Sequence, residues 1–244
     1  NTIDGGIGND TIDVSGGAGG NNSILGGDGN DLITGADTLA GAGGNDTIVA
    51  GAGNDTVLSG AGNDNVSLGD GSDTANAGSG NDTVDGGIGN DSIIGGAGTD
   101  VINGGDGNDT INAGVSAGGR DVITGGAGAD KFIFAQGDTG TTFATTDVIT
   151  DWSGTGTGAD HLALGTIGGI GNYVEATGAT ADYGDALLQA QTIFTNNAGI
   201  KYVAVQAGSD VILFLDQSGD HNIDGSIALA GKTLADIDFG NIVA

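Results

Sequence analysis

Aspartate recurs at a fixed interval through the first half of this 244-residue chain. Eight consecutive nine-residue units run from Gly41 to Asn112, and each carries Asp at its sixth position, with looser copies on both sides. Columns of such carboxylates would repel one another once the units stack. Calcium relieves that repulsion, because it is a hard cation that takes roughly six to eight oxygens from carboxylates and backbone carbonyls. The expected carboxylate ligands are Asp10, Asp31, Asp46, Asp55, Asp64, Asp73, Asp82, Asp91, Asp100, Asp109, Asp121 and Asp130.

Glycines at the second and fourth positions of each unit must form the turns that carry these carboxylates. Glycine adopts backbone angles that residues with a Cβ avoid, so the first half of a unit can turn tightly and expose its carbonyls. Ordinary solvated Asn-Asp turns are the alternative, but they give no reason to keep Asp in phase through eight units. The expected carbonyl ligands lie near Gly51, Gly53, Gly60, Gly62, Gly69, Gly71, Gly78, Gly80, Gly87, Gly89, Gly96, Gly98, Gly105 and Gly107.

The second half of each unit reads as a short extended strand. Its eighth position holds one large apolar residue between polar neighbours, which predicts one inward-facing side chain per strand. A single unit cannot bury that side chain, whereas stacked units can. The predicted core positions are Ile12, Ile33, Ile48, Val57, Val66, Ala75, Val84, Ile93, Ile102, Ile111, Ile123 and Phe132, of which only Ala75 is small.

The pattern Gly-Gly-x-Gly-x-Asp-x-U-x, where U is a large apolar residue, resembles the calcium-binding repeat of RTX proteins. The resemblance implies an all-β fold, a parallel β-roll in which two nonapeptides make one turn and residues 18 apart stack. It also implies one calcium ion between successive turns on each edge, or about one per repeat unit. One edge would carry Asp46, Asp64, Asp82 and Asp100, and the other would carry Asp55, Asp73, Asp91 and Asp109.

Three irregularities interrupt the repeats where loops could bulge outwards, at Gly16–Leu25, Gly35–Ala40 and Ala113–Thr124. The first of them has Asn22 where Asp is expected. An amide is a weaker calcium ligand than a carboxylate, so we expect a missing or water-completed site at Asn22.

Residues 135–244 lose the nine-residue period and gain most of the aromatic residues, so we expect two domains, a roll over 1–134 and a cap over 135–244. Asp182 could cap a short helix in which Tyr183, Leu187, Ala190 and Phe194 follow helical spacing. Together with the strands this predicts a small β-rich cap with one short helix. The expected strands are 146–152, 202–206, 211–215 and 223–229.

The order of segments also resembles the carboxy-terminal module of serralysin-type secreted proteins. The pieces that carry this likeness are 129–132, 147–152 and the stretch from Phe214 to Asp224 with 229–231 and 238–239 after it. Residues from about 234 to 244 are acidic first and apolar last, as in an uncleaved type I secretion signal, although an ordinary last strand is the alternative. The resemblance implies a type I secretion ABC exporter as a transient partner and an extracellular or cell-surface location on a Gram-negative cell.

Composition narrows the classes of partner. With 32 acidic against 4 basic residues the formal net charge is −28, which argues against nucleic acid and for cations. The absence of cysteine excludes disulfides and thiolate metal sites. No apolar stretch of about 18 residues exists, so we expect no membrane insertion. The chain starts in mid-repeat, so we expect it to be a piece of a longer protein.

Other motifs give little support for catalysis. Gly114–Gly118 has the Gly-x-Ser-x-Gly spacing of a nucleophile elbow but lies in a repeat insertion. His161 and His221 belong to no zinc motif, so we expect no catalytic residue and no enzyme activity in this chain. Alternating oxygens from Asp216 to Asp224 hint at an EF-hand loop, but the glycine and glutamate of that motif are missing, and a hairpin turn fits better.

The resemblance implies a module that stays unfolded inside the cell, where calcium is scarce, and folds outside the cell.

Two kinds of parent protein are alternatives for this module. One is a structural S-layer-type surface protein that uses calcium for folding and for self-association into a lattice, which the low Lys and Arg content and abundant Gly, Ala, Thr and Asn favour. The other is an exoenzyme, such as a serralysin-like protease or a lipase, that uses the module for secretion and stability. The tail of an ice- or host-binding adhesin is a third reading.

Overall fold

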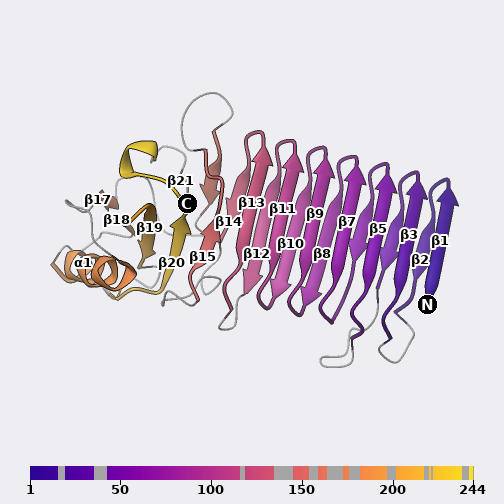
Figure 1. Cartoon of the computed structure of the whole chain (residues 1–244), viewed down its shortest axis with the longest axis horizontal. Helices are drawn as coiled ribbons and strands as arrows, with labels where there is room; N and C mark the ends of the chain where they lie inside the picture. The colour runs from indigo at the N-terminus through magenta and orange to yellow at the C-terminus, as the bar shows by residue number, and fades with distance from the viewer. Residues whose placement is uncertain are drawn as a thin grey trace.

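The computed structural model is an all-β parallel solenoid of about 6 turns, followed by a β-rich region with one helix (Figure 1). The expected fold class is therefore confirmed. The structure describes residues 1–15, 20–35, 43–115, 119–134, 145–153, 159–163, 173–175, 182–196, 202–216, 220, 222–237 and 242–243.

Two parallel sheets form the walls of the roll, and the chain alternates between them. Each unit contributes one strand, so two units complete one turn. The first wall contains β1 (Thr2–Ile7), β3 (Ser23–Asp28), β5 (Thr47–Ala52), β7 (Asn65–Asp70), β9 (Thr83–Ile88), β11 (Val101–Asp106) and β13 (Val122–Ala127). The second contains β2 (Thr11–Asp13), β4 (Leu32–Thr34), β6 (Thr56–Leu58), β8 (Thr74–Ser79), β10 (Ser92–Ala97), β12 (Thr110–Val115) and β14 (Lys131–Ile133).

The register confirms that residues 18 apart stack, as in the pairing of Ile48 with Val66 and of Ile93 with Ile111. Where the sequence has insertions, equivalent positions of the repeat still pair, and only the number of residues between the paired strands increases. Ile24 pairs with Ile48 across 24 residues. The extra residues of an insertion therefore do not disturb the pairing, because each strand repeats the same hydrogen bonds on the next.

Each long strand of the roll turns two residues inward, so each wall contributes two columns of residues to the core, one more than the sequence predicts. Every expected residue at the eighth position is buried, from Ile12 to Phe132. The first position of the next unit is buried as well, so that β7 turns both Val66 and Leu68 inward. Alternation along a strand explains the second column, since residues two apart share a face. Several of its positions hold glycine, as at Gly86, and its members with a side chain are Ala50, Ser59, Leu68, Ala77, Ala113 and Phe134.

The region after the repeats extends both walls. The first wall continues with β15 (Asp147–Ile149), β20 (Gly225–Leu229), β19 (Asp210–Leu215), β18 (Tyr202–Ala207) and β17 (Tyr173–Glu175), and the second with β16 (His161–Ala163) and β21 (Ile242–Val243). The expected strands are present, and those at 146–152 and 223–229 are shorter than predicted. A short 3-10 helix, η1 (Leu234–Asp236), follows β20.

The predicted helix forms as α1 (Tyr183–Asn196), and Asp182 caps it by accepting the N–H of Asp185 at 3.1 Å. Its buried face, Ala186, Ala190 and Phe194, packs against β18 and β19. None of the helices in the described residues is both long and apolar enough to cross a membrane.

Candidate calcium sites

Two columns of aspartates run along the two edges of the roll where the glycine turns lie. In each column the backbone N–H of one aspartate donates to Oδ1 of the aspartate one turn further on, at 2.7 to 2.9 Å. The first column comprises Asp46, Asp64, Asp82, Asp100 and Asp121, and the second comprises Asp10, Asp31, Asp55, Asp73, Asp91, Asp109 and Asp130. The structure thus brings the twelve expected carboxylates into the two arrays that the period predicts.

The second carboxylate oxygen, Oδ2, has no hydrogen-bond partner along most of both columns. It is buried and unpartnered in Asp10, Asp31, Asp55, Asp64, Asp73, Asp82, Asp91, Asp100, Asp109 and Asp130. A buried carboxylate oxygen without a donor is costly unless a cation compensates it. These oxygens therefore meet the requirement of a calcium site at the positions where the repeat places one.

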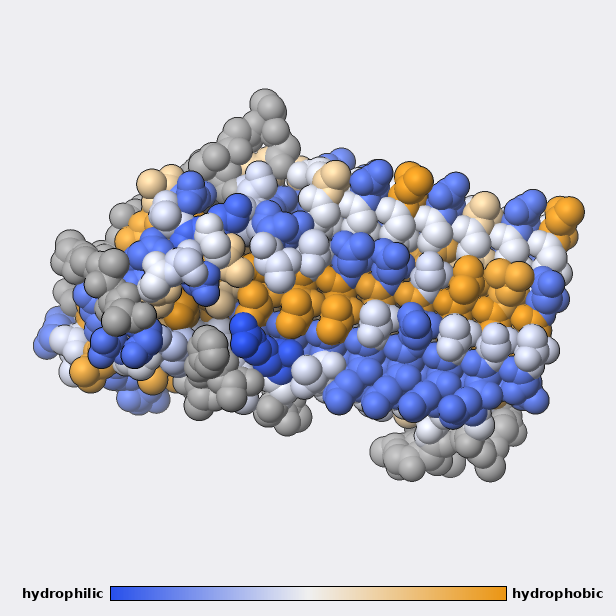
Figure 2. Space-filling view, in the orientation of Figure 1, coloured by the Kyte–Doolittle hydropathy of each residue, from blue (hydrophilic) through white to orange (hydrophobic). Residues whose placement is uncertain are grey.

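Asparagine at the fifth position makes a second ladder that runs in the opposite direction. The side-chain oxygen of Asn45 accepts the N–H of Asn63 at 2.9 Å, and Asn63 accepts that of Asn81 at 2.8 Å. These asparagines are exposed, whereas the neighbouring aspartates are buried. Figure 2 shows a continuous hydrophilic band along one edge of the roll, as exposed asparagines there would produce. Each Asn-Asp pair therefore bonds both neighbouring turns and holds the carboxylate in place.

The turn glycines lie too close to the adjacent turn to carry a side chain. Gly87 has φ +98, and a Cβ built on it would overlap the carbonyl oxygen of Gly69. In the same turn, the site for a Cβ on Gly86 lies 2.7 Å from Oδ2 of Asp91. The unpartnered oxygen thus faces the inside of its own glycine turn, and the turn's backbone carbonyls are the further ligands that calcium would need.

The donor set suits calcium better than zinc. Within the described residues, no three side chains of the His, Cys, Asp or Glu type converge on one point. A zinc site needs about four such side chains, whereas calcium accepts two carboxylates and fills its sphere with backbone carbonyls and water. Calcium would supply positive charge and oxygen coordination, and no other chemistry.

Burial raises the pKa values of eight of the column aspartates, and neighbouring carboxylates add to the effect in all of these except Asp91. The pKa of Asp82 rises to about 7 and those of Asp73, Asp100 and Asp109 to about 6. The pKa values of Asp55, Asp64, Asp91 and Asp130 are raised as well, with burial as the largest cause in each. Without a cation, these carboxyl groups therefore release their protons at a higher pH than an exposed aspartate does.

Acidification should therefore act in opposite directions on the calcium-free and calcium-bound roll. Raised pKa values mean that the folded chain holds protons that the unfolded chain releases near pH 4. Without calcium, the free energy of unfolding should be largest below about pH 4 and fall as the pH rises from 4 to 7. Calcium must displace these protons, so the affinity of the chain for calcium should decrease as the pH is lowered from about 7.5 to about 5.5. Unfolding followed by circular dichroism in calcium-depleted buffer would check the first expectation, and calcium titrations at about pH 7.5 and 5.5 would check the second. An equal calcium affinity at the two pH values would contradict the competition between protons and calcium.

Asn22 occupies the amino-terminal end of the first column, where its backbone N–H donates to Oδ1 of Asp46 as the column aspartates do. Its Nδ2 donates to Oδ1 of Asp46 at 3.0 Å and to the carbonyl oxygen of Gly20 at 2.8 Å, and its side chain is buried. An amide donor therefore lies between the carboxylate and a turn carbonyl, which gives a physical reason for the expected missing site; its absence stays a prediction.

Replacing Asn22 with aspartate should add one calcium ion per chain. The substitution removes the amide donor and leaves a second carboxylate beside Asp46, as elsewhere in the column. Calcium stoichiometry measured by titration calorimetry should rise by one, and calcium-free folding should weaken. The control is Asn45→Asp, an exposed asparagine of the outer ladder, which should leave the stoichiometry unchanged. An Asn22→Asp protein with unaltered stoichiometry would contradict the role assigned to the amide.

Two carboxylates that the sequence reasoning did not include continue the columns beyond the last repeat. Oδ1 of Asp147 accepts the N–H of Asp121 at 2.9 Å, and Oδ1 of Asp160 accepts that of Asp130 at 3.0 Å. Longer spacings concealed them, since 26 and 30 residues separate these pairs in place of 18. The signal that could have found them is an Asp two residues before a buried apolar residue, Ile149 and Leu162.

The remaining motifs do not form a reactive centre in the described residues. His161 is exposed at the start of β16 and pairs in register with Lys131. Parts of these motifs lie outside the described residues, namely residues 116–118 of the Gly-x-Ser-x-Gly segment, residues 217–219 of the expected hairpin turn, and His221.

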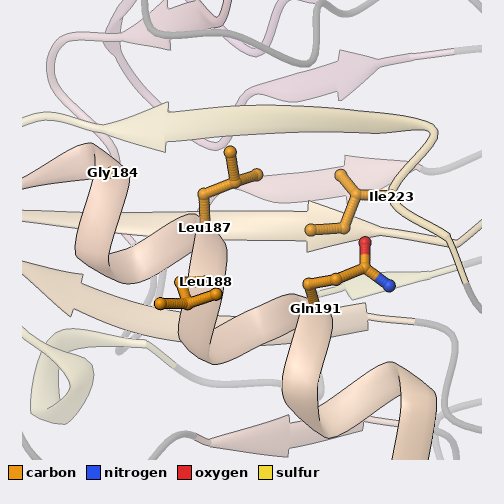
Figure 3. Close-up of a pocket in the computed structure, with 5 residues that line it drawn as sticks. All are labelled: Gly184, Leu187, Leu188, Gln191 and Ile223. Atoms are coloured by element: carbon orange, nitrogen blue, oxygen red, sulfur yellow. The ribbon is translucent and has the colours of Figure 1, made fainter.

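An apolar hollow of about 470 Å³ lies beside α1 (Figure 3). Gly184, Leu187, Leu188 and Gln191 of the helix line it together with Ile223, and Gln191 extends toward Ile223. Its lining contains no titratable side chain, so it offers no acid, base or nucleophile.

Comparison with known proteins agrees with this geometry. The sequence model of the RTX calcium-binding nonapeptide repeat matches residues 1–19, 17–37, 34–66, 59–93, 67–102, 85–117 and 115–139. No curated protein sequence matches the chain.

Among solved structures, the AlgE6R3 subunit of the Azotobacter vinelandii mannuronan C5-epimerase shares 26% identity with this chain. The match covers 67% of this chain and 77% of that subunit, with a TM-score of 0.44. The extracellular lipase LipA from Serratia marcescens shares 17% identity over 92% of this chain and 38% of its own, with a TM-score of 0.34. More than half of the chain matches the repeat, and the protein belongs to the RTX calcium-binding nonapeptide repeat family.

Proposed function

We propose that this chain is the calcium-folded carboxy-terminal module of an extracellular protein exported by type I secretion. The observation that carries the proposal is the series of buried, unpartnered Oδ2 atoms along both columns. Without a cation these carboxylates oppose folding, so the chain stays open where calcium is scarce and can pass a narrow exporter. Outside the cell, calcium at roughly millimolar concentration suits the weak affinity of extracellular sites. The binding energy then becomes folding energy.

The exporter is proposed to read the last residues of the chain, from about 234 to 244. Their acidic-then-apolar order supports this assignment. Residues 135–244 act as the cap domain that closes the roll of residues 1–134.

For the parent protein we propose a structural S-layer-type surface protein that self-associates into a lattice with calcium. Its support is the composition, with very few basic residues, no Cys or Met and a net charge of −28. Such a surface needs divalent cations before copies can approach one another. The second candidate is the secretion and stability module of a serralysin-like protease, a lipase or another RTX exoprotein. The likeness of residues 129–132 and 147–152 to the serralysin-type module supports it.

Small-angle X-ray scattering during a calcium titration tests the module and separates the two parents. The radius of gyration should fall from about 54 Å, the scale of an unfolded chain of this length, to somewhat above the compact scale of about 18 Å, because the roll is elongated. Growth into larger ordered particles at the same calcium concentrations would favour the lattice protein over the exoenzyme. A radius that does not change with calcium would overturn the proposed function.

A further inference from the structure

The sequence contains one more repeat-like unit beyond the part that matches the family. Residues 155–163 read Thr-Gly-Thr-Gly-Ala-Asp-His-Leu-Ala, with Gly156, Gly158, Asp160 and Leu162 at the second, fourth, sixth and eighth positions. The family match ends at residue 139. Residues 154–158 lie outside the described residues, and the contacts of this unit are those of residues 159–163 with the turn before Asp130.

The described part of this unit occupies the position of a repeat in the roll. In β16, Leu162 pairs with Phe132 of β14 and is fully buried, as the eighth position requires. The N–H of His161 donates to the carbonyl oxygen of Asp130 at 2.6 Å, as Lys131 does to Asp109 at 2.7 Å. The unit therefore makes the same contacts with the preceding turn as a true repeat.

Asp160 continues the second column. Its Oδ1 accepts the N–H of Asp130, and its side chain is only 3% exposed. Its Oδ2 accepts the N–H of Ser153 at 2.7 Å, a bond that fixes the orientation of the carboxylate and leaves lone pairs for a cation.

The evidence for a bound cation at this position is Oδ2 of Asp130. This side chain is 1% exposed, and its Oδ2 is buried with no hydrogen-bond partner. An ion between successive turns needs a carboxylate from each of them, and among the described residues Asp160 is the next member of the column after Asp130. Asp151 also lies near, since its carboxylate accepts the N–H groups of Gly125 and Gly126 in the turn before Asp130. On this geometry we propose that Asp130 and Asp160 hold one further calcium ion, completed by backbone carbonyls of the turn that precedes Asp130.

This inference depends on the proposed calcium-folded function and adds a site that the nonapeptide repeats do not include. It concerns the second column alone. At the corresponding end of the first column, the sequence has Phe143 and Thr145 at the two glycine positions before Asp147 and so departs from the repeat pattern.

Calcium stoichiometry of the full chain tests the site. Asp160→Asn should bind one ion fewer than the wild type. Asp85→Asn is the matched control, because it removes one charge from an exposed residue of β9 and should bind as many ions as the wild type. An Asp160→Asn protein that folds and binds the wild-type number of ions would overturn the proposal.

Anomalous diffraction from calcium-bound crystals of the wild type decides the matter if Asp160→Asn does not fold. A peak bridging Asp130 and Asp160 is the expected result. Peaks along the rest of the second column with none at this pair would overturn the inference and leave the proposed function intact. A wild-type chain that binds no calcium in titration would overturn both.

Discussion

Replacing Gly87 with alanine should prevent calcium from folding the centre of the roll. Gly87 has φ +98, a conformation that costs a residue with a Cβ on the order of 1–3 kcal/mol. The new methyl group would also overlap the carbonyl oxygen of Gly69, a backbone atom that the adjacent turn holds in place. Relief of this overlap requires the two turns to separate, which breaks the pairing of β7 with β9 and the carboxylate spacing on both sides. The calcium concentration at the folding midpoint, followed by circular dichroism, should rise at least tenfold.

Gly6→Ala is the matched control for this prediction. Gly6 has the same φ of +98, but no heavy atom lies within 4 Å of the Cβ position. Its substitution should therefore show the conformational cost alone and shift the midpoint much less. Equal shifts for the two variants would mean that strain at positive φ, and not the contact between turns, makes glycine necessary here.

The sequence predicts the roll well because its evidence is repeated. One Asp or one buried Ile would decide little, but the same phase through many units determines the strand positions, the stacking and the two carboxylate columns. The second inward column was missed for a physical reason. At the first position Ala50, Ser59 and Gly86 vary in polarity, and the position is buried because residues two apart in a strand share a face.

The ends of the columns are less predictable because they depend on contacts across insertions. Asp147 and Asp160 join the ladders through backbone bonds to residues 26 and 30 positions earlier, and no fixed period marks such spacings. The hydrogen bonds of Asn22 likewise depend on where Gly20 and Asp46 lie after an insertion. The chemistry of the sites follows from the repeat, whereas their number at either end follows from the fold.

Asp82→Asn should stabilise the calcium-free roll at neutral pH and destabilise the calcium-bound one. Asp82 is 1% exposed, its Oδ2 has no partner, and burial raises its pKa to about 7. Asparagine keeps the Oδ1 that accepts the N–H of Asp64 at 2.8 Å. Its amide can donate to the neighbouring carboxylate, as Asn22 does to Asp46. The variant therefore loses a repelling charge when calcium is absent and loses a binding site when it is present.

The size of the loss follows from linkage. At a calcium concentration about 100-fold above the dissociation constant, one site contributes about 2.7 kcal/mol to the free energy of unfolding. Urea unfolding with saturating calcium should show a decrease of about that size, and unfolding with a chelator should show an increase. Asp85→Asn removes the same charge from the exposed face of β9 and should change neither by more than about 0.5 kcal/mol. A decrease in both conditions would mean that Asp82 acts through its hydrogen bonds, since only an ion held by the carboxylate makes the sign depend on calcium.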